Sequence, residues 1–285
     1  MVNKALCIGF AYNGTRYQLN GPLNDARNMM ILFKKLGFDT QLYTDQLNRQ
    51  NAYKQNLINR LNTFMSNLND SDTGIITISS HGSLIYDTDM DEIPGEDGKQ
   101  FDQGVVCRAG DGDPMGYDLL IDDKLCELIT SNLKNKKNVK LLFIVDCCYS
   151  GSICDLQYKL KDSRYIPVGS KIINGVNHVA LISGSTEHQY SYETRINGNI
   201  QGILSNAIIK SINTLTPTNQ MINIRNLYDV LLKDKYFDSV LFPQHPVLSS
   251  NITTDLVFSI NLSTIQNNIK PVRFTRRREI LEYIC

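Results

Sequence analysis

Apolar residues along this chain follow two patterns that alternate. Short unbroken apolar runs, rich in Ile, Leu and Val, are typical of strands buried on both faces of a sheet. Such runs occupy residues 4–10, 38–43, 73–80, 140–146, 177–183 and 254–260. Between them, apolar residues recur at helical spacing in residues 24–36, 51–68, 122–133, 202–214 and 224–234. This alternation predicts an α/β fold, with a mostly parallel central β-sheet and helices on both faces.

Length and composition narrow the class of protein further. The 285 residues carry 29 basic and 29 acidic side chains, so net charge gives no argument for a nucleic-acid partner. No apolar run is long enough to span a bilayer, so we expect no membrane-spanning helix. The seven cysteines show neither a disulfide-framework spacing nor a CxxC pair. This pattern indicates free thiols in a reducing compartment, the cytoplasm, and no structural zinc site.

Two of the predicted strands end at reactive residues. Residues 75–82 read Ile-Ile-Thr-Ile-Ser-Ser-His-Gly, and residues 141–151 read Leu-Leu-Phe-Ile-Val-Asp-Cys-Cys-Tyr-Ser-Gly. Ligands of open α/β sheets bind beyond the carboxyl ends of the strands, so His81 and Cys148 are candidates for a thiol nucleophile activated by an imidazole. Gly82 lets the backbone approach a substrate, and its N–H would join that of Cys148 in an oxyanion hole. Taken singly, each could instead be structural, a packed core cysteine or a satisfied loop histidine.

These motifs together resemble those of the metacaspases, in the caspase-like clan of cysteine peptidases. Ser80-His81-Gly82 is similar to the family's histidine motif, usually Gly-His-Gly, and residues 146–151 are similar to its Asp-x-Cys-His-Ser-Gly motif. Further similar segments are residues 5–12, 19–26, 183–191, 201–202 and 246–250. The resemblance covers nearly the whole chain. It implies a caspase-like fold and a cysteine endopeptidase that works through an acyl-enzyme thioester.

The resemblance also decides between two adjacent cysteines. The family nucleophile lies two residues after the aspartate, which makes it Cys148 and leaves Cys147 packed. The chain departs from the family at Tyr149, which replaces a histidine, at Ser80, which replaces a glycine, and at Ser185, where cysteine is common. Because of Tyr149, a non-catalytic regulatory or scaffold protein is the alternative interpretation. A nucleotide-binding domain is disfavoured, since no GxGxxG or P-loop motif follows the first strand.

We expect one domain over residues 1–285. By the resemblance, residues 1–160 form a large-subunit-like part and residues 177–261 a small-subunit-like part, with a linker at 156–176 and a basic tail at 262–285. The chain looks like a short form without an N-terminal prodomain. The linker has an irregular pattern and holds Lys159, Lys161, Arg164 and Lys171. An enzyme that cuts after basic residues could process itself there, from a zymogen. The basic run in the tail is typical of a solvated helix or strand edge.

Carboxylates gather in the long connection at residues 84–118 and at the start of the helix that follows it. Clustered carboxylates repel one another, and calcium takes about six to eight oxygen ligands, so the region is a candidate calcium site. The spacing does not fit an EF-hand loop. Many metacaspases are activated by calcium, and the resemblance implies the ligands Asp102, Asp122, Asp123 and Asp155. Asp122 could instead cap the helix, with the others solvated.

The resemblance further implies cleavage after Arg or Lys. Asp146 lies two residues before the nucleophile, and Asp25 follows the first strand toward the same edge of the sheet. Two desolvated carboxylates there would bind a cationic side chain through charge-assisted hydrogen bonds. Ser183, in the family-like Ser183-Gly184 pair, is assigned to the same substrate site, and Asp25 could instead cap a helix. We therefore expect protein or peptide substrates with Arg or Lys at the cleaved position, no nucleic-acid or membrane partner and, by analogy, a monomer.

Overall fold

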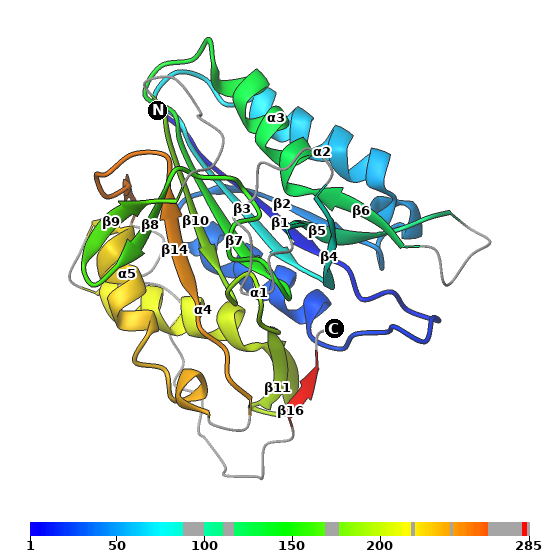
Figure 1. Ribbon diagram of the computed structural model, residues 1–285. Helices are drawn as coiled ribbons and strands as arrows, with labels where there is room; N and C mark the ends of the chain where they lie inside the picture. The colour runs from blue at the N-terminus through cyan, green and yellow to red at the C-terminus, as the bar shows by residue number, and fades with distance from the viewer. Residues whose placement is uncertain are drawn as a thin grey trace.

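The computed structural model describes residues 1–87, 100–110, 117–168, 177–217, 220–239 and 242–261, and the backbone of one further strand, β16 (Leu281–Tyr283). A twisted central sheet lies between helices on both of its faces (Figure 1). The predicted α/β architecture is therefore confirmed.

The central sheet has eight strands within the described residues, in the order β2-β1-β3-β7-β10-β14-β8-β9. Five neighbouring strands are parallel: β1 (Asn3–Gly9), β2 (Asp39–Thr44), β3 (Thr73–Ser79), β7 (Lys140–Asp146) and β10 (His178–Ser183). Three antiparallel strands complete it: β14 (Val247–Ser250), β8 (Tyr158–Lys161) and β9 (Arg164–Pro167). The central parallel strands β3 and β7 are buried almost throughout, as their unbroken apolar runs predict.

Two hydrophobic cores cover the two faces of the sheet. Alternate residues of a strand point to opposite faces, so Leu6 and Ile8 of β1 join one core while Ala5 and Cys7 join the other. The first core includes the apolar stripes of α2 (Lys54–Ser66) and α3 (Asp122–Leu133). The second includes those of α1 (Pro22–Lys35), α4 (Ile203–Leu215) and α5 (Ile224–Leu231). Figure 1 shows the two groups of helices on opposite sides of the sheet.

Two of the three smaller sheets within the described residues follow the carboxyl ends of central strands. One follows β3 and contains β4 (Gly82–Tyr86), β5 (Phe101–Arg108) and β6 (Tyr117–Ile121). Another follows β10 and contains β11 (Tyr192–Ile196), β12 (Asn199–Gly202) and β16. A third pairs β13 (Met221–Asn223) with β15 (Val257–Ser259), and the 3₁₀ helices are η1 (Arg49–Ala52) and η2 (Lys235–Asp238).

The structure differs from the sequence pattern in two segments. The linker contains the hairpin β8–β9, whose turn residues Asp162 and Ser163 both have positive φ, 46° and 63°. Two-residue hairpin turns of this kind match the twist of the strands they join. The apolar run at 254–260 forms only the three-residue strand β15, which pairs with β13, and β14 instead joins the central sheet beside β10.

Some of the predicted features lie outside the described residues. They are Lys171 of the linker, the basic residues of the tail between positions 262 and 280, and residues 88–99 of the acidic connection. Among the helices that the structure describes, none has the length and hydropathy required to cross a bilayer, as expected.

Candidate active site

The strands that carry the candidate histidine and cysteine are neighbours in the sheet. β3 pairs with β7 in parallel, and the last residues of the two strands, Ser79 and Asp146, lie opposite each other in the register. His81 and Cys148 each lie two residues beyond this pair. Both are buried, with 5% and 1% of their surface exposed. The pairing of β3 with β7 thus brings the two residues to one edge of the sheet.

Gly82 lets the histidine segment pack against the nucleophile segment. A Cβ atom at position 82 would lie 2.0 Å from the carbonyl oxygen of Cys148 and 3.0 Å from its amide nitrogen. Side chains do not tolerate such approaches, so the contact requires glycine. The two N–H groups predicted to form an oxyanion hole, those of Gly82 and Cys148, therefore belong to segments in direct contact.

A backbone carbonyl orients the imidazole of His81. Nε2 lies 2.7 Å from the carbonyl oxygen of Tyr17. A carbonyl only accepts hydrogen bonds, so Nε2 carries the proton and Nδ1 is the basic nitrogen of the ring. The rings of Tyr12 and Tyr17 flank the imidazole, with centroids at 5.1 and 6.5 Å. This arrangement fixes both the tautomer and the orientation that a general base needs.

The segment that carries Tyr17 is itself held by a buried ion pair. Asp45 accepts the backbone N–H groups of Ala11 and Tyr12, at 3.0 and 2.7 Å. Arg108 lies 3.8 Å from the same carboxylate, and both side chains are buried. The backbone carbonyl that orients His81 thus depends on Asp45 and Arg108, two side chains that the sequence pattern did not indicate as part of the site.

The three departures from the family motifs each have a partner in the structure. The Ser80 hydroxyl is hydrogen-bonded to the phenol of Tyr12. The Ser185 hydroxyl donates to the carbonyl oxygen of Cys147 at 3.2 Å. Tyr149 packs edge-on against Tyr190, with ring centroids 5.4 Å apart. None of these contacts removes His81 or Cys148 from the site.

The adjacent cysteines have different surroundings. Cys147 is fully buried, and burial raises the pKa of its thiol well above the ordinary value, so it stays protonated. The Sγ atom of Cys148 accepts the backbone N–H of Ser191 at 3.3 Å. It also takes part in a disulfide, whereas Cys7, Cys107, Cys126, Cys147 and Cys154 form none.

Asp25 and Asp146 lie side by side beneath this edge, both 1% exposed. A Cβ atom at Gly202 would lie 2.2 Å from Oδ2 of Asp146 and 3.0 Å from Oδ2 of Asp25, so one glycine touches both carboxylates. Burial raises the pKa of both groups, and for Asp25 the charge of Asp146 adds to the rise. Burial and mutual repulsion thus disfavour two negative charges at this place, and a nearby cation would favour the ionised forms.

Serines and backbone N–H groups hold these carboxylates in place. Asp146 accepts the Ser191 hydroxyl at 2.6 Å and both the hydroxyl and the N–H of Ser205 at 2.8 Å, in the first turn of α4. Asp25 accepts the Ser79 hydroxyl at 2.8 Å and the N–H of Gly202 at 3.0 Å. The neighbours therefore favour the charged form that desolvation opposes.

Ser79, which donates to Asp25, is a serine at the acidic pair that the sequence pattern did not indicate. The predicted Ser183 is fully buried and donates to the carbonyl of Ser185 at 3.0 Å, inside its own loop. A substrate contact by Ser183 stays a prediction. The register could have revealed Ser79, because it is the β3 residue opposite Asp146.

A third carboxylate, Glu193, lies close to the pair and was also missed. It is 1% exposed and accepts the N–H of Gly21 at 2.7 Å and that of Asn20 at 3.1 Å. Its charge contributes to the raised pKa of Asp25. Glu193 thereby ties β11 to the loop that leads into α1.

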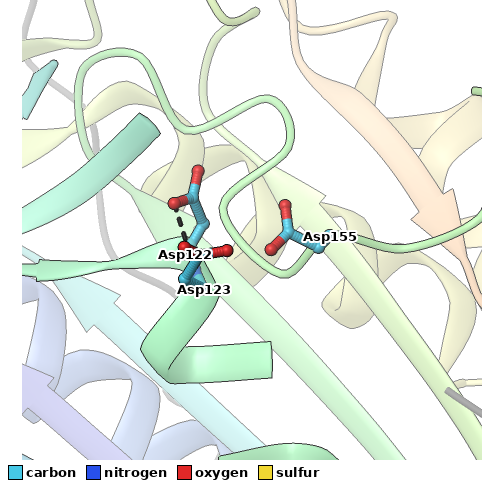
Figure 2. Close-up of side chains that lie close together, drawn as sticks. All are labelled: Asp122, Asp123 and Asp155. Atoms are coloured by element: carbon cyan, nitrogen blue, oxygen red, sulfur yellow. Dashed lines mark hydrogen bonds between the residues drawn. The ribbon is translucent and has the colours of Figure 1, made fainter. Parts of the chain in front are cut away.

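Three of the four predicted calcium ligands form a group. Carboxylate oxygens of Asp122, Asp123 and Asp155 all lie within 4.8 Å of one another. Figure 2 shows Asp122 and Asp123 at the start of α3, with Asp155 facing them from the loop that follows the nucleophile. Such a set of hard oxygen donors fits a calcium ion, which would offset their mutual repulsion. Asp102 is buried on β5 but is not a member of this group.

A neighbouring glutamine connects this group to the nucleophile loop. The backbone N–H of Gln103 donates to Asp122 at 2.7 Å, and its side-chain oxygen accepts the N–H of Ser152 at 2.9 Å. Ser152 lies four residues after Cys148 and three before Asp155. The candidate cation site and the nucleophile are therefore joined by a short, hydrogen-bonded loop.

Comparisons with known proteins address the family and the fold of the chain. A family model described as the caspase domain matches residues 2–257. The chain is 26% identical to a protein named Metacaspase-1 from Meyerozyma guilliermondii over 306 residues, covering 89% of this chain and 70% of that protein. It is 31% identical to Metacaspase-1 of Plasmodium falciparum over 199 residues, covering 67% of this chain and 31% of that protein. Against several such relatives it thus spans only about a third to a half of their length.

A solved structure shows the same fold. The crystal structure of protein GSU0716 from Geobacter sulfurreducens superposes with a TM-score of 0.60 at 19% identity, covering 90% of this chain and 95% of that one. At this identity the likeness concerns the fold alone.

Proposed function

The chain belongs to the caspase-domain family of cysteine peptidases, with metacaspases among its relatives, and we propose that it is a calcium-dependent endopeptidase that cleaves after Arg or Lys. Cysteine-peptidase chemistry follows from the family, whereas the specificity and the role of calcium are the proposal. The observation that carries it is the placement of His81 and Cys148 at one sheet edge, beside the buried carboxylates Asp25 and Asp146.

The proposed reaction starts from the tautomer that Tyr17 selects. Nδ1 of His81 takes the proton of the Cys148 thiol, and the thiolate attacks the carbonyl carbon of the cleaved bond. The N–H groups of Gly82 and Cys148 stabilise the developing oxyanion. The imidazolium then protonates the leaving amine. Water, deprotonated by the same imidazole, hydrolyses the thioester and frees the enzyme.

The acidic pair supports the proposed preference for Arg or Lys. A guanidinium or ammonium group that reaches Asp25 and Asp146 would relieve the repulsion that raises their pKa values. A neutral side chain would leave both charges buried without a countercharge, which is costly. An acidic side chain, which caspases accept, would add a third negative charge.

The aspartate group supports the calcium part of the proposal. Asp122 and Asp123 at the start of α3 and Asp155 after the nucleophile would hold the ion, with Asp102 proposed as a further ligand. When bound, the ion would supply positive charge that draws α3 and the nucleophile loop together. Because Gln103 is hydrogen-bonded to both Asp122 and Ser152, ion binding would then also fix the loop that follows Cys148.

Self-processing and a monomeric state form the last part of the proposal. Lys159 and Lys161 lie in β8 and Arg164 in β9, and Lys159 is ion-paired with Glu187. Cleavage after any of them requires the hairpin to leave the sheet first. In its paired state β8 covers the edge of β14, so that edge is closed to a second copy of the chain, which supports a monomer. Within the described residues, the thiols of Cys7, Cys107, Cys147 and Cys154, which form no disulfide, fit the proposed cytoplasmic location.

One assay tests the proposal. Reduced protein is given a fluorogenic peptide ending in Arg and a matched peptide ending in Asp, with and without millimolar calcium, alongside Cys148→Ala. We expect calcium-dependent cleavage of the Arg peptide only, lost in the variant. Folded protein that cleaves neither peptide in any condition would overturn the proposal and favour the non-catalytic alternative.

A further inference from the structure

Tyr12, in the loop after β1, has a backbone conformation that bulky residues rarely adopt. Its φ is +53°, in the left-handed region, where a Cβ atom crowds the backbone. The carboxylate of Asp45 accepts the N–H groups of Ala11 and Tyr12 and so holds this turn in place. Strained residues gather at functional sites, which makes the side chain of Tyr12 a candidate for a role in the site.

The phenol of Tyr12 is the centre of a buried hydrogen-bond network beside His81. Its oxygen lies 2.6 Å from the carbonyl oxygen of Val106 and 2.5 Å from Oγ of Ser80, and all three residues are at most 4% exposed. A carbonyl only accepts, so the phenol donates to Val106 and accepts the hydroxyl proton of Ser80. Burial raises the pKa of the phenol well above its ordinary value, so it keeps the proton that it donates.

Both partners of the phenol are joined to the backbone of His81. The N–H of Val106 donates to the carbonyl oxygen of His81 at 3.0 Å, and Ser80 is the residue before His81. The Ser80 hydroxyl also lies 3.2 Å from that carbonyl, an acceptor to which it would turn without the phenol. The ring of Tyr12 lies against the imidazole, with centroids 5.1 Å apart. The phenol hydroxyl thus fixes a ring that supports the ring of His81.

A threonine ties Tyr12 to the carbonyl that orients the imidazole. The hydroxyl of Thr15 donates to the carbonyl oxygen of Tyr12 at 2.8 Å and accepts the N–H of Tyr17 at 3.2 Å. The carbonyl oxygen of Tyr17 in turn lies 2.7 Å from Nε2 of His81. Tyr12 is therefore linked to His81 through its side chain, and to the anchor of His81 through its backbone.

We propose that Tyr12 is a positioning residue whose phenol, together with the Ser80 hydroxyl, fixes the imidazole of His81 relative to the carbonyl of Tyr17. This inference rests on the proposed function, because it takes His81 as the general base. Tyr12 acts through His81 and does not enter the reaction itself. A loosely held base slows proton transfer without weakening substrate binding, so the loss falls on kcat and not on KM.

Kinetics of the reduced protein with an Arg-ended fluorogenic peptide test this role. Tyr12→Phe keeps the ring and removes the hydroxyl, and we expect kcat to fall about tenfold with KM within about twofold of the wild type. Tyr228→Phe is the matched control, because its buried phenol also donates to a backbone carbonyl, that of Pro246, at 2.7 Å. The control should keep the kcat of the wild type. A folded Tyr12→Phe enzyme with unchanged kcat, or with a change in KM alone, would overturn the proposal.

Two further variants examine the partners of Tyr12. Because the two hydroxyls act as one unit, Y12F/S80A should lose no more activity than Tyr12→Phe, and losses that multiply would overturn the shared role. Thr15→Val removes the bridge to Tyr17 at a half-buried position, so it tests the proposal even if Tyr12→Phe does not fold. We expect kcat to fall about threefold at constant KM, and an unchanged kcat would count against the proposed link.

Nuclear magnetic resonance gives a measurement that does not depend on activity. With ¹⁵N in the four histidines, long-range imidazole signals identify the tautomer at mildly alkaline pH, where the ring is neutral, and His81→Ala assigns the signal. We expect the Nε2–H tautomer alone in the wild type and Tyr228→Phe, and a mixture of tautomers in Tyr12→Phe. The pure Nε2–H tautomer in Tyr12→Phe would overturn the proposal. An inactive wild type would refute the proposed function instead, while the tautomers still show whether Tyr12 fixes the ring.

Discussion

Replacing Gly82 by alanine tests how tightly the histidine and nucleophile segments must pack. The added Cβ would lie 2.0 Å from the carbonyl oxygen of Cys148, and at 3.0 Å from both the carbonyl carbon and the amide nitrogen of that residue. Each of these atoms is backbone, so no side chain can rotate away. Either β4 or the turn after β7 must move by about 1 Å before the methyl group fits.

The expected cost follows from this displacement. A misplacement of about 1 Å between reacting groups lowers the rate by roughly 100-fold, which is about 2.7 kcal/mol of transition-state stabilisation. Gly82→Ala should therefore lower kcat/KM for an Arg-ended peptide by about two orders of magnitude. The strain should also lower the free energy of unfolding, by about 1–3 kcal/mol, as overpacking does in other proteins.

Two measurements separate the catalytic loss from simple unfolding. Gly198→Ala adds the same methyl group where nothing lies within 4 Å, at a φ of +89°, so it should cost some stability but no activity. Circular dichroism melting shows whether each variant is folded at the assay temperature. A folded Gly82→Ala enzyme whose kcat/KM stays within about threefold of the wild type would refute the close packing described here.

Three other variants test the remaining parts of the site. His81→Ala should remove nearly all cleavage at neutral pH, since His81 is the proposed general base for the thiol of Cys148; a rate near that of the wild type in a peptide assay would contradict the dyad. Asp25→Asn should lower the preference for Arg and Lys, measured with a peptide library, yet raise the melting temperature at neutral pH. The pKa of Asp25 in the folded state lies above its ordinary value. The folded protein is therefore most stable below the ordinary pKa, and it loses stability as pH rises from there through the raised pKa. Asparagine carries no charge and avoids this loss of stability. For the same reason, Arg cleavage by the wild type should decline as pH falls through this raised pKa, and an unchanged specificity in Asp25→Asn would count against the pocket. The double variant D122N/D123N should raise the calcium concentration needed for half-maximal activity by roughly tenfold; calorimetry of calcium binding that is unchanged would remove both residues as ligands.

The fold and the two reactive strand ends could be predicted from the sequence because they depend on local patterns of residues. The runs that became β3 and β7 are apolar on both faces, and this pattern predicts central parallel strands. His81 and Cys148 each lie two residues after the paired residues Ser79 and Asp146, which end these runs. Their meeting at one edge is therefore a geometric result of strand pairing, visible before any side-chain contact is known.

Other parts of the site could not be predicted because backbone atoms supply them. The anchor of His81 is the carbonyl of Tyr17, and every residue has a carbonyl, so side-chain identity gives no signal. Gly202 donates its backbone N–H to Asp25, and its lack of a side chain leaves room for the carboxylate of Asp146. Glu193 lies 168 residues after Asp25, and only the fold of β11 onto the α1 loop brings them together.

The hairpin β8–β9 was hidden for a different reason. Its turn is Asp162-Ser163, which lacks the Asn-Gly or Asp-Gly pair that marks most such turns. Basic side chains at Lys159, Lys161 and Arg164 also break the apolar alternation expected of a strand. The hairpin forms because β14 offers an edge for β8 to pair with, which is a tertiary effect that outweighs local preference.

The buried pair of Asp25 and Asp146 is held together from both sides of the linker. Asp25 and Asp146 come before it, whereas Gly202 and Ser205, which donate to them, come after it. Together with the long pairing of β7 with β10, these bonds would hold the two pieces of a nicked chain as one particle. A cut protein should run as two bands on a denaturing gel but elute at the mass of the intact chain. Two fragments made separately could also be mixed. Their reassembly would restore the hydrogen bonds of Gly202 and Ser205 to Asp25 and Asp146.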